Sequence, residues 1–397
     1  MKVLHCITST GVGGAQVMLL RYLRALGPLA REHTVYSLMP RGEIGDEIAA
    51  LGVAVRSADM GQGAYSLRGL LHLRRTIGEV GPDLVHGWMY HGNLAARLAS
   101  MGPGARPPVV WAVHHSLQDI RAERRSSRVV MRASALLSGG VAGISYCARI
   151  AADQHAALGF AAKKGIVIPN GIDTDEFRPQ PDARARLGAL AGIPDDRVII
   201  GNVGRDHPMK DQARMVAAVA RLLERGHNVH AVLIGFGQED GSARRAADEL
   251  GIGDRVTTLA ERNDIAHLVG GFDIFLLPSA WGEAFPLAVC EAMAVGVPAV
   301  VTDVGDSSWI VGDTGTVVPP GDTEAQADAL AALVTLGRSG RQALGRAARA
   351  RICDNFSISR FVEAHETWYR SVTATGPSGA GAPGAAADRS PNGGLAR

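Results

Sequence analysis

Cysteine is scarce in this chain of 397 residues, which has only Cys6, Cys147, Cys290 and Cys353. They are scattered singly, with no CxxC pair and no spacing that suits a disulfide framework or a closed zinc site. The sequence therefore excludes a disulfide-stapled secreted domain and indicates a reducing, cytosolic compartment.

An excess of charge and a membrane-spanning run are also missing. The 41 lysines and arginines nearly balance the 39 aspartates and glutamates, so the net charge is only +2, too small for a protein that coats nucleic acid. The most apolar long window, 284–301, contains Glu291 and two prolines, which makes it a poor span. The apolar run after Met1 is too short for a signal peptide. We expect a cytoplasmic protein, at most peripheral at the inner face of the membrane.

Short β-branched runs alternate with longer amphipathic stretches, as in βα units that build parallel sheets. The predicted strands form two series: 3–7, 34–38, 53–56, 84–86, 109–114, 141–145 and 165–168, then 198–203, 229–234, 256–259, 274–277, 299–302 and 315–318. The length suits two domains of ordinary size. We predict an α/β protein with two Rossmann-like, doubly wound parallel-sheet domains, 1–175 and 176–357, facing each other across a cleft that holds the site.

The end of the chain has a different composition. Residues 376–397 are rich in glycine, alanine, proline and serine, which predicts a disordered tail. Just before them, Phe361, Trp368 and Tyr369 lie on a predicted helix at about 358–373, which we expect to pack back on the amino-terminal domain.

The segment 279–293 reads as a strand end, a loop and a helix start. Pro286 suits a first helical turn, and a helix start offers unpaired N–H groups and a positive dipole end to an anion. Glu283 and Glu291 flank this start. Because a carboxylate accepts hydrogen bonds from vicinal hydroxyls, the pair favours a ligand with two polyol portions around a phosphate. The alternative is two solvated surface glutamates.

Two further loops follow predicted first strands. Arg205 and Lys210 come after 198–203, where two cations could neutralise a diphosphate or merely solvate a loop. Gly13 and Gly14 come after 3–7, where a backbone can approach a phosphate, although a plain βα turn fits equally. The loop matches neither GxGxxG nor a P-loop, so an NAD dehydrogenase is not indicated.

Taken together, these motifs resemble a known family. The Glu283-x7-Glu291 spacing, the Arg205 and Lys210 pair, the loop 13–16 and the linker 169–173 are similar to those of the retaining family-4 glycosyltransferases, or glycosyl transferases group 1, of GT-B architecture. The resemblance covers the chain up to about residue 373.

The resemblance implies that the carboxyl-terminal domain binds a nucleotide-sugar donor, expected to be UDP-linked. Arg205 and Lys210 would then bind the diphosphate, Glu283 the sugar hydroxyls and Glu291 the ribose hydroxyls. The other implied donor-binding residues are Phe285, Leu287 and Ala288 through their amides, Arg262 at the base pocket, and Gly13, Gly14, Gly235 and Gly237 on donor-facing loops.

His114 falls at a strand end where similar enzymes place a histidine against the donor sugar, although a lone histidine there can also be structural. His115 would face the opposite way if the strand continued. Gln16 stands where many relatives have Glu. The resemblance implies same-face attack by an acceptor hydroxyl, with retention, while Arg205, Lys210 and the helix start stabilise the leaving diphosphate. A two-carboxylate glycosidase fits less well, because both glutamates lie beside the phosphate-binding helix start.

No cofactor and no metal are expected. Asp173-Thr174-Asp175 mimics an Asp-x-Asp metal motif, but its place in the interdomain connection favours a turn or capping role. The histidines His86, His91, His114 and His115 lack the spacing of a closed zinc set.

The expected acceptor is a glycan or a lipid-linked glycan in polysaccharide or glycoconjugate synthesis, and no nucleic acid is expected. The basic stretch 121–132 could dock on anionic lipid or form a solvated helix face. Two alternatives remain open: a nucleotide-sugar epimerase on the same two-domain plan, and a scaffold that binds the sugar nucleotide without turnover.

Overall fold

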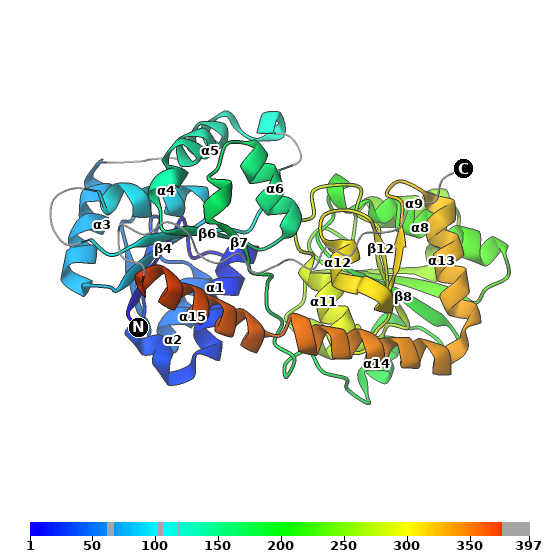
Figure 1. Ribbon diagram of the computed structural model, residues 1–397. Coiled ribbons are helices and arrows are strands. Elements are labelled where there is room, and N and C mark those ends of the chain that lie inside the picture. Colours follow the sequence, from blue (N-terminus) through cyan, green and yellow to red (C-terminus); the bar gives the residue numbers. More distant parts are fainter. Residues whose placement is uncertain (62–66, 102–105, 118–119, 375–397) are drawn as a thin grey trace.

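The structure is a computed structural model that describes residues 1–61, 67–101, 106–117 and 120–374. Two α/β domains lie next to each other along the molecule (Figure 1). The predicted tail, 376–397, lies outside the described residues. Within the described ranges, no helix is both long enough and apolar enough to cross a bilayer.

The amino-terminal domain is built on one parallel sheet with the strand order β3-β2-β1-β4-β5-β6-β7. Its strands are β1 (Val3–Ile7), β2 (Thr34–Ser37), β3 (Ala54–Ser57), β4 (Leu84–Trp88), β5 (Val109–Val113), β6 (Gly143–Tyr146) and β7 (Gly165–Val167). Its helices are α1 (Gly14–Ala25), α2 (Glu43–Ala50), α3 (Leu67–Val80), α4 (Met89–Ala99), α5 (Arg125–Leu137) and α6 (Arg149–Ala157). Strands β1, β4 and β5 are buried along their whole length, which accounts for their largely apolar sequences.

The carboxyl-terminal domain repeats this plan with the strand order β10-β9-β8-β11-β12-β13. Its strands are β8 (Val198–Val203), β9 (Val229–Ile234), β10 (Val256–Leu259), β11 (Ile274–Leu277), β12 (Ala299–Thr302) and β13 (Thr316–Val318). Its helices are α7 (Ala183–Ala191), α8 (Gln212–Glu224), α9 (Ser242–Glu249), α10 (Ile265–Leu268), α11 (Leu287–Ala294), α12 (Ser307–Val311), α13 (Thr323–Thr335) and α14 (Gly337–Asn355). The predicted pair of doubly wound parallel sheets is confirmed.

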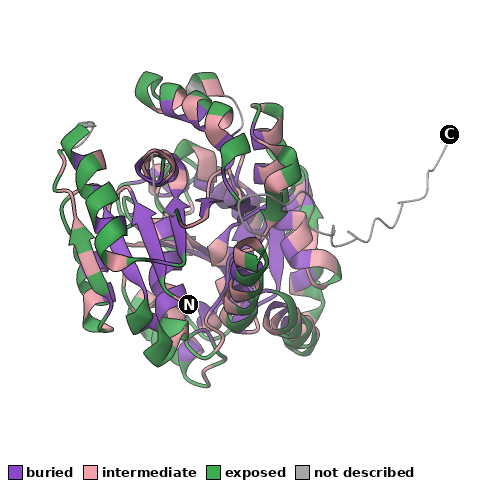
Figure 2. Cartoon of the chain, turned by 60° about the vertical axis from the view of Figure 1, so that its left-hand side comes forward, coloured by how far each residue is buried: buried purple, intermediate pink, exposed green. Residues whose placement is uncertain are grey.

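The buried residues gather in the two sheets and on the inward faces of the helices, while the outward helix faces are exposed (Figure 2). In each sheet the strand order reverses once, between β1 and β4 and between β8 and β11. At such a reversal the neighbouring loops diverge and leave a crevice at the carboxyl ends of the strands. The predicted site segments follow these strands, so the topology places them at this edge.

The chain crosses between the domains twice, and the two crossings lie side by side. Ile172 N donates to Phe356 O at 2.8 Å, and Ile358 N donates to Ile172 O at 2.7 Å. Helix α15 (Ile358–Ala374) then lies over the amino-terminal domain (Figure 1), where the Tyr369 hydroxyl is 2.7 Å from His86 Nδ1. The carboxyl-terminal helix therefore belongs to the core of the other domain.

Candidate functional site

The centre of the candidate site is an ion pair between Lys210 and Glu283. Lys210 ends a 3-10 turn (Pro208–Lys210) after β8, and Glu283 lies in the loop between the neighbouring strand β11 and helix α11. Lys210 Nζ lies 2.6 Å from Glu283 Oε1, and Glu283 is only 7% exposed. Two predicted residues that are 73 positions apart therefore meet because their strands are adjacent.

Ser279 fixes the same carboxylate. Its hydroxyl donates to Glu283 Oε1 at 2.6 Å, so this one oxygen receives both the lysine and the serine. Glu283 Oε2 has no hydrogen-bond partner in the described part of the chain. An ionised carboxylate only accepts hydrogen bonds, so Oε2 can accept hydrogen bonds from a ligand that carries hydroxyl groups.

Close backbone packing holds the loop that carries Arg205 and Lys210. At Gly282, where φ is +79°, a Cβ would lie 2.5 Å from Met209 Sδ. At Gly235, where φ is +153°, a Cβ would lie 2.2 Å from Gly204 O. Since only glycine fits these contacts, the loops after β9 and β11 support the loop after β8 from both sides.

Arg205 lies exposed on this supported loop, and its guanidinium makes no ion pair in the described residues. Its backbone is held, because Gln212 Nε2 donates to Arg205 O at 3.1 Å and to Gly204 O at 3.3 Å. The site therefore combines a cation engaged by Glu283 with a second cation that faces solvent, an arrangement that suits an anionic ligand.

Helix α11 starts at Leu287, four residues after Glu283. Pro286 is its N-cap, one position before the first helical turn in which it was expected. The amides of Leu287 and Ala288 belong to that turn, where N–H groups lack intrahelical acceptors. The Phe285 ring turns inward and packs edge-on against Trp309 and Phe356. Phe285 can therefore offer a ligand its backbone but not its ring.

Glu291 meets a residue that the sequence interpretation missed. Arg21, on α1 of the other domain, places Nη2 2.9 Å from Glu291 Oε1, and the two side chains are 12% and 14% exposed. The guanidinium carbon lies 5.7 Å from the centre of the Phe177 ring. A separation of 270 residues gives no local signal for this pair.

His114 lies just after β5 and contacts its own domain and the linker. Its Nδ1 is 3.0 Å from Asn170 Oδ1, and its ring stacks on Trp88 with centroids 5.2 Å apart. Burial lowers the pKa of His114 to about 4, although the Asn170 hydrogen bond acts in the opposite direction. The imidazole is therefore neutral at pH 7. His115 has a different environment, with Nε2 3.0 Å from Glu123 Oε1.

Arg262 is engaged within its own loop after β10. Its Nε and Nη2 lie 2.7 and 2.8 Å from the two carboxylate oxygens of Asp264. These hydrogen bonds lower the pKa of Asp264. Arg262 thus follows β10, which lies next to β9, and its guanidinium is paired with Asp264 of the same loop.

The glycine loops also lie at strand ends. Gly13 and Gly14 follow β1, and Gln16 Nε2 donates to Ser9 Oγ at 3.3 Å across that loop. A Cβ on Gly14 would meet nothing within 4 Å. Gly237 follows β9 with φ of +76°. Like Gly235, it lies on the loop beside the one that carries Arg205.

The two domains are joined across the site by contacts that no local sequence pattern indicated. Ser116 Oγ donates to Gly282 O at 2.9 Å. Asp306 accepts hydrogen bonds from the amides of Arg149 and Ile150, at 2.5 and 3.1 Å, where α6 begins. The Arg149 guanidinium carbon lies 4.0 Å from the centre of the Trp309 ring. The Asp306 contacts and the Arg149–Trp309 contact are called the clasp below.

The side chain of Asp173 stabilises a turn, as predicted. Its Oδ1 accepts hydrogen bonds from the amides of Asp175 and Glu176, both at 3.0 Å. Across the described ranges, no group of three or more histidine, cysteine or acidic side chains is arranged to hold a metal ion.

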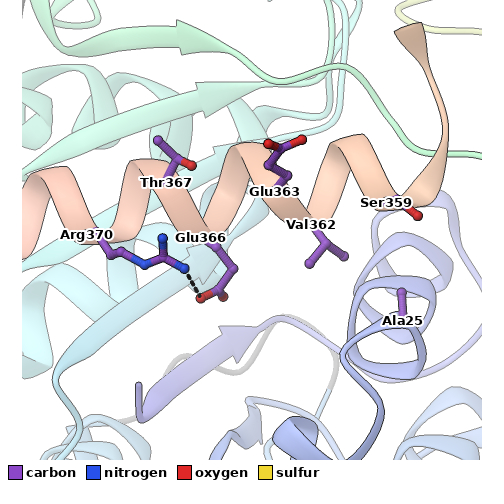
Figure 3. Close-up of a pocket in the computed structure, with 7 residues that line it drawn as sticks. All are labelled: Ala25, Ser359, Val362, Glu363, Glu366, Thr367 and Arg370. Carbon is purple, nitrogen blue, oxygen red and sulfur yellow. Dashed lines mark ion pairs between the residues drawn. The ribbon is translucent and has the colours of Figure 1, made fainter. Parts of the chain in front are cut away.

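A pocket of about 380 Å³ lies between α1 and α15 (Figure 3). Its side chains include Glu363, Glu366 and Arg370, with Arg370 turned toward Glu366. It contains none of the predicted site residues, so the candidate site is the cluster at the strand ends.

Two family models match this chain in succession. Residues 12–176 match "Glycosyltransferase Family 4" and residues 189–351 match "Glycosyl transferases group 1". The two matches cover the amino-terminal and carboxyl-terminal domains, and Glu283, Glu291, Arg205 and Lys210 all lie in the second.

Curated relatives share about a third of the aligned residues. The chain is 36% identical to the putative glycosyltransferase EpsF of Bacillus subtilis over 34% of this chain and 35% of that protein. It is 38% identical to a D-inositol 3-phosphate glycosyltransferase of Mycolicibacterium paratuberculosis over 46% of this chain and 42% of that protein. It is 34% identical to the enzyme of the same name from Saccharomonospora viridis over 57% of this chain and 54% of that protein. The matched stretch spans about a third to a half of the length of these relatives.

Solved structures share the fold. Anabaena Alr3699/HepE in complex with UDP has a TM-score of 0.80 and 22% identity, covering 94% of this chain and 100% of that one. The same protein in complex with UDP-glucose has a TM-score of 0.77 and 21% identity, again covering 94% of this chain and 100% of that one. A glycosyltransferase from Rickettsia africae has a TM-score of 0.78 and 18% identity, and the match covers 94% of this chain and 98% of that one.

Proposed function

Because the chain belongs to the family-4 glycosyltransferases and has the GT-B fold, we propose that it transfers a sugar from a nucleoside-diphosphate donor to a glycan or lipid-linked acceptor. We infer a UDP-linked donor, in support of which a protein of the same fold has been solved with UDP and with UDP-glucose. The proposed setting is polysaccharide or glycoconjugate synthesis.

The observation that carries this proposal is the buried Glu283 carboxylate held on one oxygen by Lys210 and Ser279. Its other oxygen lacks a protein partner in the described residues. Arg205 is exposed on the loop that carries Lys210, and α11 starts four residues after Glu283. This arrangement places a hydroxyl acceptor next to an anion site, as the sugar and the phosphate of a nucleotide sugar require.

In the proposed reaction, the bond between the anomeric carbon and the diphosphate oxygen breaks while the acceptor hydroxyl forms a new bond on the same face. The acceptor proton passes to the departing phosphate oxygen. Arg205, Lys210 and the first amides of α11 stabilise the charge that develops on the diphosphate. Glu283 holds the donor sugar, Glu291 the ribose, and neutral His114 provides a hydrogen-bonding group from the other domain.

The test is incubation with UDP-, GDP- and ADP-sugars, with and without cell-envelope acceptors, while nucleoside diphosphate release is measured. Release that depends on the acceptor supports the transferase, and a product that keeps the anomeric configuration of the donor supports retention. Free sugar formed without an acceptor would indicate the epimerase. Binding without any turnover would indicate the scaffold.

Lys210→Ala and Glu283→Ala should each abolish turnover, because Lys210→Ala leaves the buried Glu283 carboxylate without its charged partner and Glu283→Ala removes the contact to the donor sugar. Lys163→Ala changes an exposed lysine of the amino-terminal domain and provides the matched control. Near-normal transfer by both site variants would overturn the site assignment.

We also propose that the amino-terminal domain contacts an anionic membrane. Helix α5 exposes Val129 and Leu136, which are 68% and 86% exposed, beside exposed Arg125 and Arg132. A helix with cationic and apolar groups on its exposed side suits the surface of an anionic bilayer, where each basic residue contributes about 1 kcal/mol.

Liposome flotation tests this contact. Wild-type protein should float with anionic vesicles, and Arg125→Glu combined with Arg132→Glu should remain at the bottom. Arg186→Glu combined with Arg338→Glu, at exposed positions on α7 and α14 of the other domain, is the charge-matched control. Failure of the wild type to bind anionic vesicles at low salt would rule out the membrane contact.

A further inference from the structure

The two acidic residues of the site are held in the same way but from different domains. Lys210, of the carboxyl-terminal domain, contacts Glu283 Oε1 at 2.6 Å. Arg21, of the amino-terminal domain, contacts Glu291 Oε1 at 2.9 Å. In the described residues, the second oxygen of each carboxylate has no hydrogen-bond partner. In both cases a basic side chain holds one oxygen and the other oxygen is left for a ligand.

In the described residues, the hydrogen bonds of the Arg21 side chain go to Glu291 alone. Its side chain is 12% exposed, and its guanidinium carbon lies 5.7 Å from the centre of the Phe177 ring. Nη1 is buried without a hydrogen-bond partner in the described part of the chain. A guanidinium has five N–H donors, so one that only stabilised the fold would be expected to use more of them. Its position is set by Glu291.

We propose that Arg21 is a positioning residue for the donor: it orients Glu291 so that Oε2 receives the ribose hydroxyls, and it makes ribose recognition depend on closure of the two domains. The proposal rests on the proposed function, which assigns the ribose to Glu291. Arg21 lies on α1, whose first residue, Gly14, ends the glycine loop after β1. If the amino-terminal domain moved away from the other domain, Arg21 would separate from Glu291, and the glycine loop would move away from the donor site at the same time.

Calorimetry with UDP and with its 2′,3′-dideoxy analogue tests the proposal. Wild-type protein should prefer UDP by about tenfold or more, because two hydroxyls bond to an oriented carboxylate. Arg21→Met should bind the dideoxy analogue as the wild type does and should lose most of the preference for UDP. Arg21→Lys should restore part of it. Arg24→Met is the matched control, since Arg24 lies one turn along α1 and pairs with Glu47 inside its own domain.

The outcomes separate this inference from the proposed function. A preference for UDP that survives in Arg21→Met, or an equal loss for both ligands, would overturn the positioning role. Tighter UDP binding by Arg21→Met would also overturn it, because Arg21 would then compete with the ribose. Equal binding of both ligands by the wild type would show that the ribose hydroxyls are not recognised. If the wild type bound neither ligand, the proposed function itself would fail.

Discussion

At the scale of single residues, the cost of burying Glu283 explains why its neighbours matter. A buried carboxylate is tolerated only when it is paired and hydrogen-bonded. Lys210 supplies the charge, and Ser279 supplies a hydroxyl on the same oxygen. The serine therefore sets the direction in which the remaining oxygen points, although it needs no contact with the ligand.

We therefore predict that Ser279→Ala lowers kcat/KM for the donor by about tenfold, the effect of losing one hydrogen bond of about 1.4 kcal/mol to a charged group. The fold should persist, since Lys210 still pairs with Glu283. Steady-state kinetics and thermal unfolding would measure the two effects. Ser307→Ala removes another buried hydroxyl, bonded to Val304 O at 2.6 Å, and should leave kcat/KM nearly unchanged. Equal kinetics for the two variants would contradict the role of Ser279.

His114 gives a prediction about pH. Its pKa is lowered to about 4 by burial, so the imidazole stays neutral throughout the range from pH 5.5 to 8. We expect pH profiles of kcat/KM with the same shape over this range for wild type and His114→Gln, even if the variant is slower at every pH. A change in kcat/KM of the wild type near pH 6.5 that is absent from His114→Gln would show that His114 titrates between pH 5.5 and 8.

At the scale of helices and strands, the sequence was informative because the central strands, such as β1, β4 and β5, are buried along their whole length. Each predicted strand overlaps an observed one, with ends that agree within two residues. Lys210 and Glu283 were predicted as ligand-binding residues, but their contact with each other was not, because it depends on β8 lying next to β11. Arg21, Ser116 and Asp306 gave no signal, since their partners come from the other domain.

Gly235 tests the loop packing that supports the site. A methyl group there would meet Gly204 O at 2.2 Å, with φ at +153°, so Gly235→Ala must displace the loop that carries Arg205. We expect a loss of UDP affinity of about tenfold or more and a lower melting temperature. Calorimetry and thermal unfolding would measure these effects.

The control for Gly235 is Gly226→Ala. Gly226 has φ of +82° but open space around its Cβ position, so this variant carries backbone strain without a clash. It should lower the melting temperature slightly and leave UDP affinity within about twofold. Unchanged UDP affinity in Gly235→Ala would contradict the supporting role of this glycine.

At the scale of the whole molecule, the clasp links domain closure to the site. Asp306 caps α6 of the opposite domain, and its own amide donates to Ala284 O at 3.0 Å, next to Glu283. Asp306→Ala removes the acceptor for both α6 amides. We expect an increased radius of gyration in X-ray scattering and a higher KM for the donor. Asp303→Ala, three positions earlier and outside the clasp, is the control. An unchanged scattering profile would show that other contacts are sufficient for closure.

The buried histidines determine how the whole molecule responds to acid. Burial lowers the pKa of His33 and His155 to about 4 and that of His365 to about 3. In the unfolded chain these groups titrate near 6.5. Between these values the unfolded state binds more protons than the folded state, so stability rises with pH across this window and is lost as the pH falls from about 6.5 to 4.

One histidine with such a shift removes about 3 kcal/mol once the pH is below both of its pKa values, a large part of the ~5–15 kcal/mol that stabilises a typical domain. We therefore predict that the melting temperature falls steeply between pH 7 and pH 5 at constant ionic strength. His155→Gln should reduce this slope, because an amide cannot be protonated there. His267→Gln, at an exposed position on α10, should keep the wild-type slope. A melting temperature independent of pH over this range would mean that the buried rings accept protons without unfolding, which their enclosure in the core opposes.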